Sequence, residues 1–272
     1  MTTVSKFLLT TIIFCASINT FAQAVQGVAT YKSHRKVDLK MDKKEMNDEM
    51  QEQIQAQLRK QFQQEYTLKF TQSESVYKRN ESLEAPNPIS SGFQITIAQN
   101  TDIFYKNIKE KRYTKETEIF GKQFLIQDVL EDTSWELLKE TKNIGEYTCY
   151  KAQFKEEVTG STFNEKGEIE KVTKERVTTA WYTPQIPINN GPDDFQGLPG
   201  LILEINDGEL TLVCTKIVIN PKDPIQIKEP KKGKEVTQAK FDEIRQKKQD
   251  EMLENARSSR KGGETFIIKT GG

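Results

Sequence analysis

The side chains in this sequence that could do chemistry are mostly carboxylates, because the chain contains one histidine, His34. A single histidine excludes multi-histidine zinc sites, and no Gly-x-Ser-x-Gly, Cys-x-x-Cys or glycine-rich phosphate-binding motif occurs. Asp193, Asp194 and Glu204 are the acids of a proline-rich loop and the segment after it. They could bind Ca²⁺ or act as acid and base, but Pro-Asp-Asp is also ordinary turn composition. We therefore expect solvated turn residues, with no catalytic set, no metal site and no cofactor.

The loop that carries these acids lies within residues 180–205 and is the stretch best suited to bind a ligand or a partner. It holds four of the nine prolines, and Pro199-Gly200 has the composition of a type II turn. Its aromatic side chains could line a pocket, or they could close one end of a sheet by packing. The candidate binding residues are Trp181, Tyr182, Pro184, Gly191, Pro192, Phe195, Gly197, Leu198, Pro199, Gly200 and Glu204.

Short runs with strand-like alternation surround this loop and must position it. Tyr66, Leu68 and Phe70 alternate with polar residues, and Asp207-Gly208 is a strong two-residue hairpin signal. Strands at this spacing favour an antiparallel meander, and a curved sheet or half-barrel would bury one face of it. The predicted fold is mainly β with two flanking amphipathic or charged helices, an α+β arrangement. We expect strands at 25–31, 66–71, 73–78, 102–107, 112–120, 123–128, 134–139, 147–155, 172–182, 201–205 and 209–219, with loops at 82–92 and 159–170.

Two segments have helical rather than strand periodicity. Within residues 43–64, apolar residues recur every fourth position in a stripe formed by Met46, Met50, Ile54, Leu58 and Phe62. A second helix is expected over residues 236–256, which are rich in Lys, Glu and Gln. The expected layout is therefore a β domain over residues 23–225 with a helix inserted near 43–64. A charged helical extension and tail would follow over residues 226–272.

The first 22 residues have the order of a secretory signal peptide. Lys6 precedes an apolar run of about ten residues, which is too short to span a bilayer. Thr20 and Ala22 then occupy the positions that favour cleavage before Gln23, and Ala24 offers a second cleavage position. Phe14 before Cys15 does not fit a lipidation motif. The sequence thus predicts an exported protein, located in the periplasm or associated with the outer membrane.

The charge balance limits the partners of the exported chain. The 272 residues contain 40 basic and 40 acidic side chains, and removal of residues 1–22 would take away Lys6 alone, leaving 39 and 40. A net charge near zero argues against a nucleic-acid partner, which requires a basic field. No later apolar run approaches 18 residues, so no transmembrane segment is expected after signal removal. The kinds of partner that these observations leave are an unknown apolar ligand and an envelope protein.

Two cysteines, Cys149 and Cys214, remain after signal removal, and both lie in strand-like runs. In an oxidising compartment they could form a disulfide if their strands are neighbours. The alternative is two separately buried thiols. The sequence leaves both readings open.

The segment Phe195–Ile202 contains the intact hexapeptide Gly-Leu-Pro-Gly-Leu-Ile. Upstream lie Ala180–Pro184, the Gly191-Pro192 pair and Cys149–Ala152 (Cys-Tyr-Lys-Ala). In these features the chain resembles the GLPGLI family of exported bacterial proteins of unknown function. The resemblance is most specific over residues 143–210. It implies export and no particular reaction or catalytic residues, since none is established for the family.

These observations together favour a non-enzymatic envelope protein that binds a ligand or partner with a curved antiparallel sheet. A carrier of an apolar ligand would need an open cavity on the concave face. One alternative is a carboxylate-based periplasmic hydrolase, which requires two acids converging in a cleft near residues 181–204. Another is an envelope assembly or adaptor protein that uses its charged helices as docking surfaces.

Overall fold

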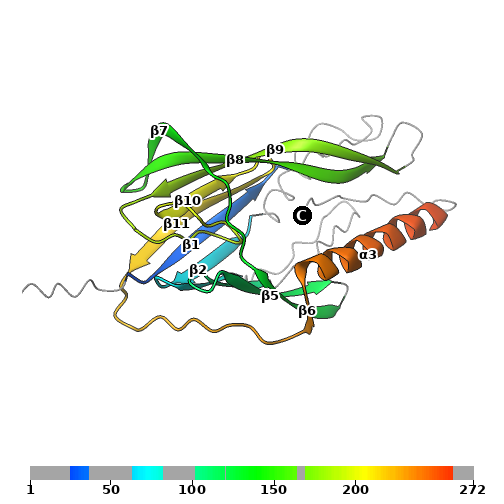
Figure 1. Ribbon diagram of the computed structural model, residues 1–272, viewed down its shortest axis with the longest axis horizontal. Coiled ribbons are helices and arrows are strands. Elements are labelled where there is room, and N and C mark those ends of the chain that lie inside the picture. Colours follow the sequence, from blue (N-terminus) through cyan, green and yellow to red (C-terminus); the bar gives the residue numbers. More distant parts are fainter. Residues whose placement is uncertain (1–24, 37–62, 82–101, 120, 164–168, 260–272) are drawn as a thin grey trace, which may run out of the picture.

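The computed structural model describes residues 25–36, 63–81, 102–119, 121–163 and 169–259. Twelve strands in these ranges join in one sheet, and one helix accompanies it (Figure 1). The elements are β1 (Gly27–Arg35), β2 (Glu65–Phe70), β3 (Glu74–Arg79), β4 (Ile103–Asn107), β5 (Arg112–Ile119), β6 (Lys122–Val129), β7 (Glu136–Ile144), β8 (Tyr147–Phe163), β9 (Ile169–Thr183), β10 (Leu201–Asn206), β11 (Leu210–Ile219), β12 (Lys234–Val236) and α3 (Gln238–Ser259).

The N-terminal strand β1 is at the centre of the sheet and joins two meanders. The spatial order is β12-β6-β5-β4-β3-β2-β1-β11-β10-β9-β8-β7. Ala29 of β1 lies opposite Leu68 of β2 on one side and Ile217 of β11 on the other. Each pair from β6 to β7 is antiparallel, whereas β12 pairs with β6 in parallel. The prediction of a mainly β, mostly antiparallel architecture is therefore confirmed.

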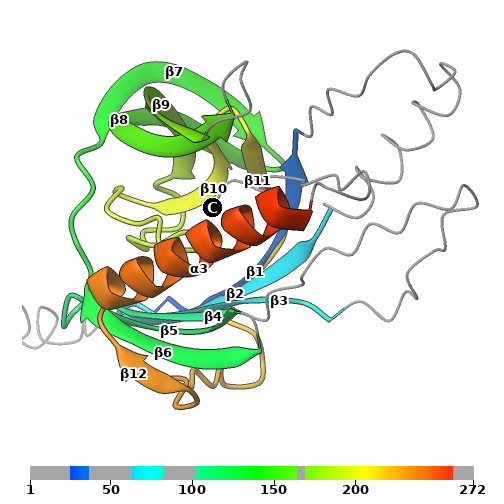
Figure 2. The ribbon, with the colours of Figure 1, turned by 90° about the vertical axis from the view of Figure 1, so that its right-hand side faces the viewer.

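The sheet curves strongly, and Figure 2 shows it bending from β6 through β1 to β8 and β9, with α3 across the open side. Register shifts in β1 at Thr30/Tyr31 and in β10 between Ile202 and Glu204 interrupt regular pairing, and such bulges increase local twist and bending. The main core cluster combines side chains of β1 to β4, β10 and β11 with Cys149 of β8 and with Ile186 and Ile188 of the following loop. Much of the volume enclosed by the curved sheet is thus filled by the chain itself.

The C-terminal part of the described chain wraps around the β6 side of the sheet. We call residues 220–233 the strap. Glu229 of the strap contacts Thr114, while Gln238 of α3 accepts a hydrogen bond from the hydroxyl of Tyr113 at 3.0 Å. Because neighbouring residues of a strand point to opposite faces, the strap and α3 lie on opposite faces of β5. On the α3 side, Phe241 packs edge-on against Phe124 with ring centroids 5.5 Å apart.

Two sequence predictions need correction, and one strand has no counterpart among them. The expected loop at 159–170 is largely strand, because β8 runs to Phe163 and β9 starts at Ile169, and this long hairpin extends beyond the other strands in Figure 1. Two flanking helices are not borne out, because α3 is the helix that the described residues contain. Of the helix expected near 43–64, residues 43–62 lie outside the described residues, as does the loop expected at 82–92. Strand β12 was not predicted, since three residues carry no periodicity.

Within the described ranges, no helix combines the length and the apolar character needed to cross a bilayer.

Candidate functional site

The loop between β9 and β10 folds onto the inner face of the sheet and is fixed there by its backbone. Leu201 N donates a hydrogen bond to Ile186 O at 3.0 Å, and Ile202 N donates to Asn190 O at 3.0 Å. Leu198, 1 % exposed, and the isoleucines at 186 and 188 supply the apolar contacts. The loop is therefore a packed part of the core.

Lys106 of β4 connects the sheet to this loop. Its side chain is fully buried, and its Nζ donates hydrogen bonds to Gly191 O at 2.9 Å and to Phe195 O at 3.0 Å. Burial lowers the pKa of Lys106 to about 7, although the nearby carboxylates of Asp194 and Asp193 act in the opposite direction. Lys106 thus holds two carbonyl groups of the loop that would otherwise be buried without donors.

Charged groups gather around this connection. The Nζ of Lys115 on β5 lies 3.4 Å from a carboxylate oxygen of Asp102. Burial acts to lower the pKa of Lys115, but the negative charges of Asp193, Asp102 and Asp194 outweigh burial and raise it. Burial, followed by the charge of Asp193, raises the pKa of Asp194 to about 6, against the influence of the lysines. Solvent reaches the Asp194 side chain, but the surrounding protein is dense enough that lost hydration is the largest cause. Asp193 is half-buried and Asp194 is exposed, so these two acids are turn residues open to solvent that also lie close to Lys106 and Lys115.

A cavity of about 200 Å³ lies beside these charges, and we call it the tyrosine cavity. The rings of Tyr66 and Tyr77 stack on each other in its wall, with centroids 5.0 Å apart and planes 6° from parallel. Tyr77 is 5 % exposed, and its buried hydroxyl has no hydrogen-bond partner among the described residues. Asp193, whose backbone φ is 49°, also lines this cavity. The cavity is lined by Ser33, Arg35, Gln64, Tyr66, Tyr77, Asp193, Leu210 and Leu212.

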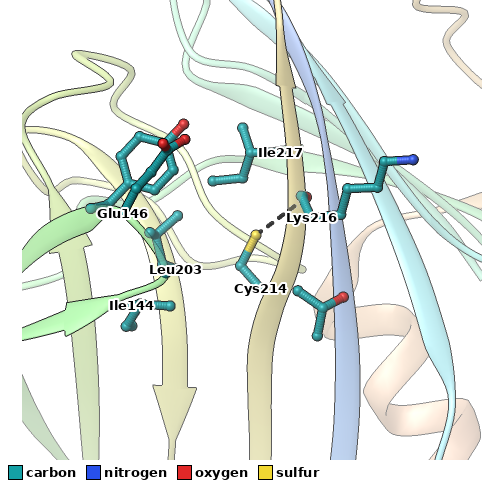
Figure 3. Close-up of a pocket in the computed structure, with 9 residues that line it drawn as sticks. Ile144, Glu146, Leu203, Cys214, Lys216 and Ile217 are labelled. Carbon is teal, nitrogen blue, oxygen red and sulfur yellow. Dashed lines mark hydrogen bonds between the residues drawn. The ribbon is translucent and has the colours of Figure 1, made fainter.

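A second cavity, of about 220 Å³, lies where the β7–β8 turn meets β10 and β11 (Figure 3). The thiol of Cys214 points among Ile144, Leu203 and Ile217 and donates a hydrogen bond to Lys216 O at 3.6 Å. Burial raises the pKa of Cys214 to about 12 and that of Cys149 to about 11, so both thiols stay protonated at neutral pH. Such thiols pack well but are poor nucleophiles.

Both cysteines are free in the structure. Cys149 is on β8 and Cys214 on β11, and β9 and β10 lie between those strands. The condition that the two strands be neighbours is therefore not met.

Most of the sequence-predicted binding residues are structural parts of the loop. Glu204 pairs with Lys142 at 2.7 Å, and that lysine lies 4.4 Å above the ring of Trp181. Trp181 and Phe195 are half-buried and Pro184 is exposed, whereas five of the predicted residues are buried: Tyr182, Gly191, Pro192, Leu198 and Gly200. None of the eleven predicted residues lines either cavity. Among the described residues, no group of three or more His, Cys, Asp or Glu side chains could hold a metal ion.

The turn at Pro199-Gly200 differs from the predicted type II turn. Gly200 N donates to Leu198 O at 2.8 Å, which closes a three-residue γ-turn around Pro199. The amide that a type II turn would use, that of Leu201, instead donates to Ile186 O. The glycine is required by space, because a Cβ at position 200 would lie 2.2 Å from the carbonyl oxygen of Thr183.

The residues that sequence reasoning missed are Lys106 and the two tyrosines of the cavity. One signal was available for the lysine. Phe104 and Lys106 lie two positions apart in a short apolar run, so the strand period places both on one face. A lysine on the apolar face of a strand indicates a buried cation with a specific partner.

Comparison with known proteins identifies similarity to one family model. The model, described as "Protein of unknown function (Porph_ging)", matches residues 135–204, which include β7 to β9, the loop and most of β10. No curated protein matches the chain.

Among solved structures, the chain is similar in fold to PNGF-II in space group C2, at 12% identity and a TM-score of 0.46, covering 81% of this chain and 32% of PNGF-II. For PNGF-II in space group P21, the identity is 11%, the TM-score 0.47, and the coverage 81% and 33%. This chain thus spans about a third of the PNGF-II chain. Over residues 135–204, it is similar to a family of proteins of unknown function.

Proposed function

We propose that this protein is an exported member of the GLPGLI family that binds a small ligand in the tyrosine cavity and does not transform it. The observation that carries the proposal is the tyrosine cavity itself, which combines the stacked rings of Tyr66 and Tyr77 with Asp193 and Arg35 from distant segments. Aromatic rings beside a few charged and hydrogen-bonding side chains are typical of small-molecule sites. The family match over residues 135–204 includes the intact Gly-Leu-Pro-Gly-Leu-Ile and supports the family assignment.

The cavity favours a small polar ligand over the apolar ligand expected from sequence. Cavities of about 200 and 220 Å³ are smaller than the roughly 300–1,000 Å³ typical of ligand sites. The wall of the tyrosine cavity carries two charged and several hydrogen-bonding side chains, which an alkyl chain would leave unpaired. An apolar carrier therefore gains no support from the described residues.

The binding proposal is tested by a thermal-shift screen of the exported chain with soluble amino acids, sugars, nucleosides and organic acids. We expect some compounds of one chemical class to raise the melting temperature of the wild-type protein. The same compounds should not raise the melting temperature of Asp193→Asn. Asparagine tolerates the positive φ at position 193, so the fold is kept. The control is Glu209→Gln, because the Glu209 side chain is 54% exposed. This variant should respond to the compounds as wild type does. A screen without any Asp193-dependent stabilisation would refute binding in this cavity.

Export is tested separately by fractionation of cells that express the full chain. We expect the protein in the periplasmic or outer-membrane fraction, with a mature N-terminus at Gln23, as the order of Lys6, the apolar run and Ala22 predicts. An uncleaved protein in the cytoplasm would refute this part of the proposal.

A carboxylate-based hydrolase is the second candidate, and the raised pKa of Asp194 favours it. A carboxyl group with a pKa of about 6 beside the carboxyl group of Asp193 could serve as a general acid next to a general base. If the protein is a hydrolase, glycoside, ester or peptide substrates should be cleaved with an alkaline limb near pH 6. Asp194→Asn should then abolish the cleavage, and absence of turnover on all three substrate classes would exclude this candidate.

A further inference from the structure

The turn at residues 191–195 is fastened to the rest of the protein at both ends and to Lys106 of β4 between them. We propose that this turn is a pH-sensitive latch, which Lys106 holds closed in alkaline solution and which opens more often as the pH falls towards neutrality. The inference goes beyond the proposed function, because it concerns a motion of the chain itself and needs no ligand.

Both ends of the latch are anchored by neutral hydrogen bonds. At the first end, Asn190 O accepts a hydrogen bond from Ile202 N at 3.0 Å. At the second end, Gln196 O accepts one from the indole Nε1 of Trp135 at 2.7 Å, and Gln196 Nε2 donates to Glu131 O at 2.9 Å. None of these backbone, amide and indole groups titrates near neutral pH, so the ends stay fixed while the residues between them can move.

Between these ends, Lys106 joins the latch to the sheet. Its Nζ donates to Gly191 O at 2.9 Å and to Phe195 O at 3.0 Å, on the first and last residues of the turn. Packing of the Phe195 ring against Trp135 and Phe154 also opposes opening, but it does not depend on pH. Opening of the latch therefore breaks both bonds from Lys106 and gives its ammonium group access to water.

The closed latch keeps that ammonium group away from water. Lys106 is fully buried and both acceptors are neutral carbonyl groups, and burial is the largest cause that lowers its pKa to about 7. In the open latch the group is hydrated, and its pKa returns towards the ordinary value of 10.5. The open state then binds more protons between these two values, so each pH unit downwards favours opening by up to about 10-fold. Below pH 7 the amine is charged in both states, and Lys106 adds no further change.

The titratable groups around Lys106 lie in the turn, on the strands beside β4 and just before β4: Asp193, Asp194, Lys115, Tyr113, Tyr77 and Asp102. The charges of Asp194 and Asp193 act to raise the pKa of Lys106 and so limit the effect of burial. Burial raises the pKa of both tyrosines; for Lys115 burial acts to lower the pKa, but the nearby carboxylates outweigh it. Asp194, with a pKa of about 6, titrates mainly below pH 7. We therefore assign the response between pH 7 and pH 9 to Lys106.

The test is hydrogen exchange of the Phe195 amide, which donates to Pro192 O at 3.1 Å and exchanges when the turn unfolds locally. The rate is measured by NMR on the exported chain and divided by that of an unstructured peptide at the same pH, which gives the opening equilibrium constant. In wild type this constant should fall by up to about 10-fold per unit between pH 7 and pH 9. In Lys106→Met it should not depend on pH. Lys111→Met is the control, since that side chain is 64% exposed, and it should behave as wild type does.

A second measurement on wild type keeps the latch testable if Lys106→Met folds poorly. Acetic anhydride modifies neutral amines that contact water, so it reaches Lys106 from the open latch only. For Lys111 the modification rate should rise by about 10-fold per pH unit, because the neutral fraction of the amine does. For Lys106 the rate should change little between pH 7 and pH 9, because the growing neutral fraction of the open latch is offset by its falling population.

Three results would overturn the latch. The first is an opening constant for Phe195 that does not change with pH in wild type, or a Lys106 modification rate that rises as that of Lys111 does. The second is a pH dependence that persists in Lys106→Met. The third is an equal opening constant for Phe195 and for the fully buried Leu68 of β2, which would mean that the whole sheet opens.

The latch and the proposed function fail separately. Asp193 lies in the turn and lines the tyrosine cavity, so opening also changes the wall of that cavity. A thermal-shift screen without hits would leave the latch intact, since hydrogen exchange and lysine modification need no ligand. Overturning the latch would in turn leave any Asp193-dependent hit of the screen standing.

Discussion

At the scale of single residues, Gly200 shows how closely the loop approaches the sheet. A Cβ at this position would lie 2.2 Å from Thr183 O and 2.5 Å from the Thr183 carbonyl carbon, both of which are backbone atoms. Gly200→Ala should therefore lower the free energy of unfolding by about 3 kcal/mol, because the backbone of β9 or of the loop has to shift. Urea unfolding followed by tryptophan fluorescence measures the loss.

The matched control for this glycine is Gly208 in the β10–β11 turn. The φ of Gly208 is 91°, and no atom lies within 4 Å of an added Cβ. Gly208→Ala should therefore lower the free energy of unfolding by about 1 kcal/mol, because alanine disfavours a positive φ and no steric clash is added. Equal losses in the two variants would contradict the role given to the Thr183 contact.

Lys106 predicts a dependence of stability on pH. Its pKa in the folded protein is about 7, below the value of 10.5 for an unperturbed lysine, so above pH 7 the unfolded state binds more protons. The stability of wild type should therefore rise between pH 7 and pH 9, by at most about 1.4 kcal/mol per pH unit. Lys106→Met, which has no titrating group at this position, should lack that rise in urea unfolding at pH 7, 8 and 9.

The comparison between the two proteins isolates Lys106 from the other buried groups. Burial raises the pKa values of the Cys149 and Cys214 thiols above the ordinary value of 9.0, so these thiols reduce stability as the pH increases beyond about 9. This effect is the same in wild type and Lys106→Met and cancels in the difference. Parallel pH curves for the two proteins would show that Lys106 is charged throughout this range.

At the scale of elements, the strap depends on one acid. Glu229 accepts two hydrogen bonds from Arg112, at 2.6 and 3.2 Å, and a further one from the hydroxyl of Thr114. Glu229→Gln should weaken this bidentate contact, lower the stability by about 1 kcal/mol and increase protease cleavage within residues 220–233. Limited proteolysis followed by mass spectrometry would locate the cuts.

Glu209→Gln is the control for the strap. Glu209 pairs with Lys174 at 2.6 Å, but both side chains are more than half exposed, and such pairs contribute little. If this variant is as sensitive to protease as Glu229→Gln, the strap is not held by Glu229 in particular.

Elements with a clear period were predictable from sequence, and elements without one were not. The alternation of Tyr66, Leu68 and Phe70 located β2, and Asp207-Gly208 located the turn before β11. The ends of β8 and β9 are rich in Thr, Ser, Glu and Gly, which resembles loop composition, and their pairing is stabilised by the hairpin itself. Strand β12 forms through its pairing with β6 and carries no signal of its own.

At the scale of the whole molecule, the tyrosine cavity could not be predicted because its wall comes from distant segments. The sequence identifies Asp193 as an acid of the loop, but it identifies Tyr66 and Tyr77 only as strand residues. These three meet because β1 lies between β2 and β11, an order that local patterns do not encode. The loop itself was predictable as a stiff junction, since its prolines and glycines constrain the backbone locally.

The structure also predicts the state of the cysteines. Cys149 and Cys214 belong to the same core cluster but are unpaired, and we expect both to remain thiols even in an oxidising compartment. A thiol-reactive dye should label neither in the native exported protein within minutes, because both are buried and protonated at neutral pH. In denaturant without reductant, two thiols per exported chain should react, and fewer than two would reveal a disulfide.

The central position of β1 has a consequence in time. Strand β1 pairs with β2 and with β11, and the second pairing cannot form until β11 has been synthesised. The hydrogen bond from the Tyr31 hydroxyl to Ile202 O likewise joins residues 171 positions apart in the sequence. Synthesis proceeds from the N-terminus, so the two halves of the sheet cannot be joined until most of the chain has been made. During most of its synthesis the polypeptide is therefore without a closed core, the condition in which a chain can still be threaded through a narrow channel.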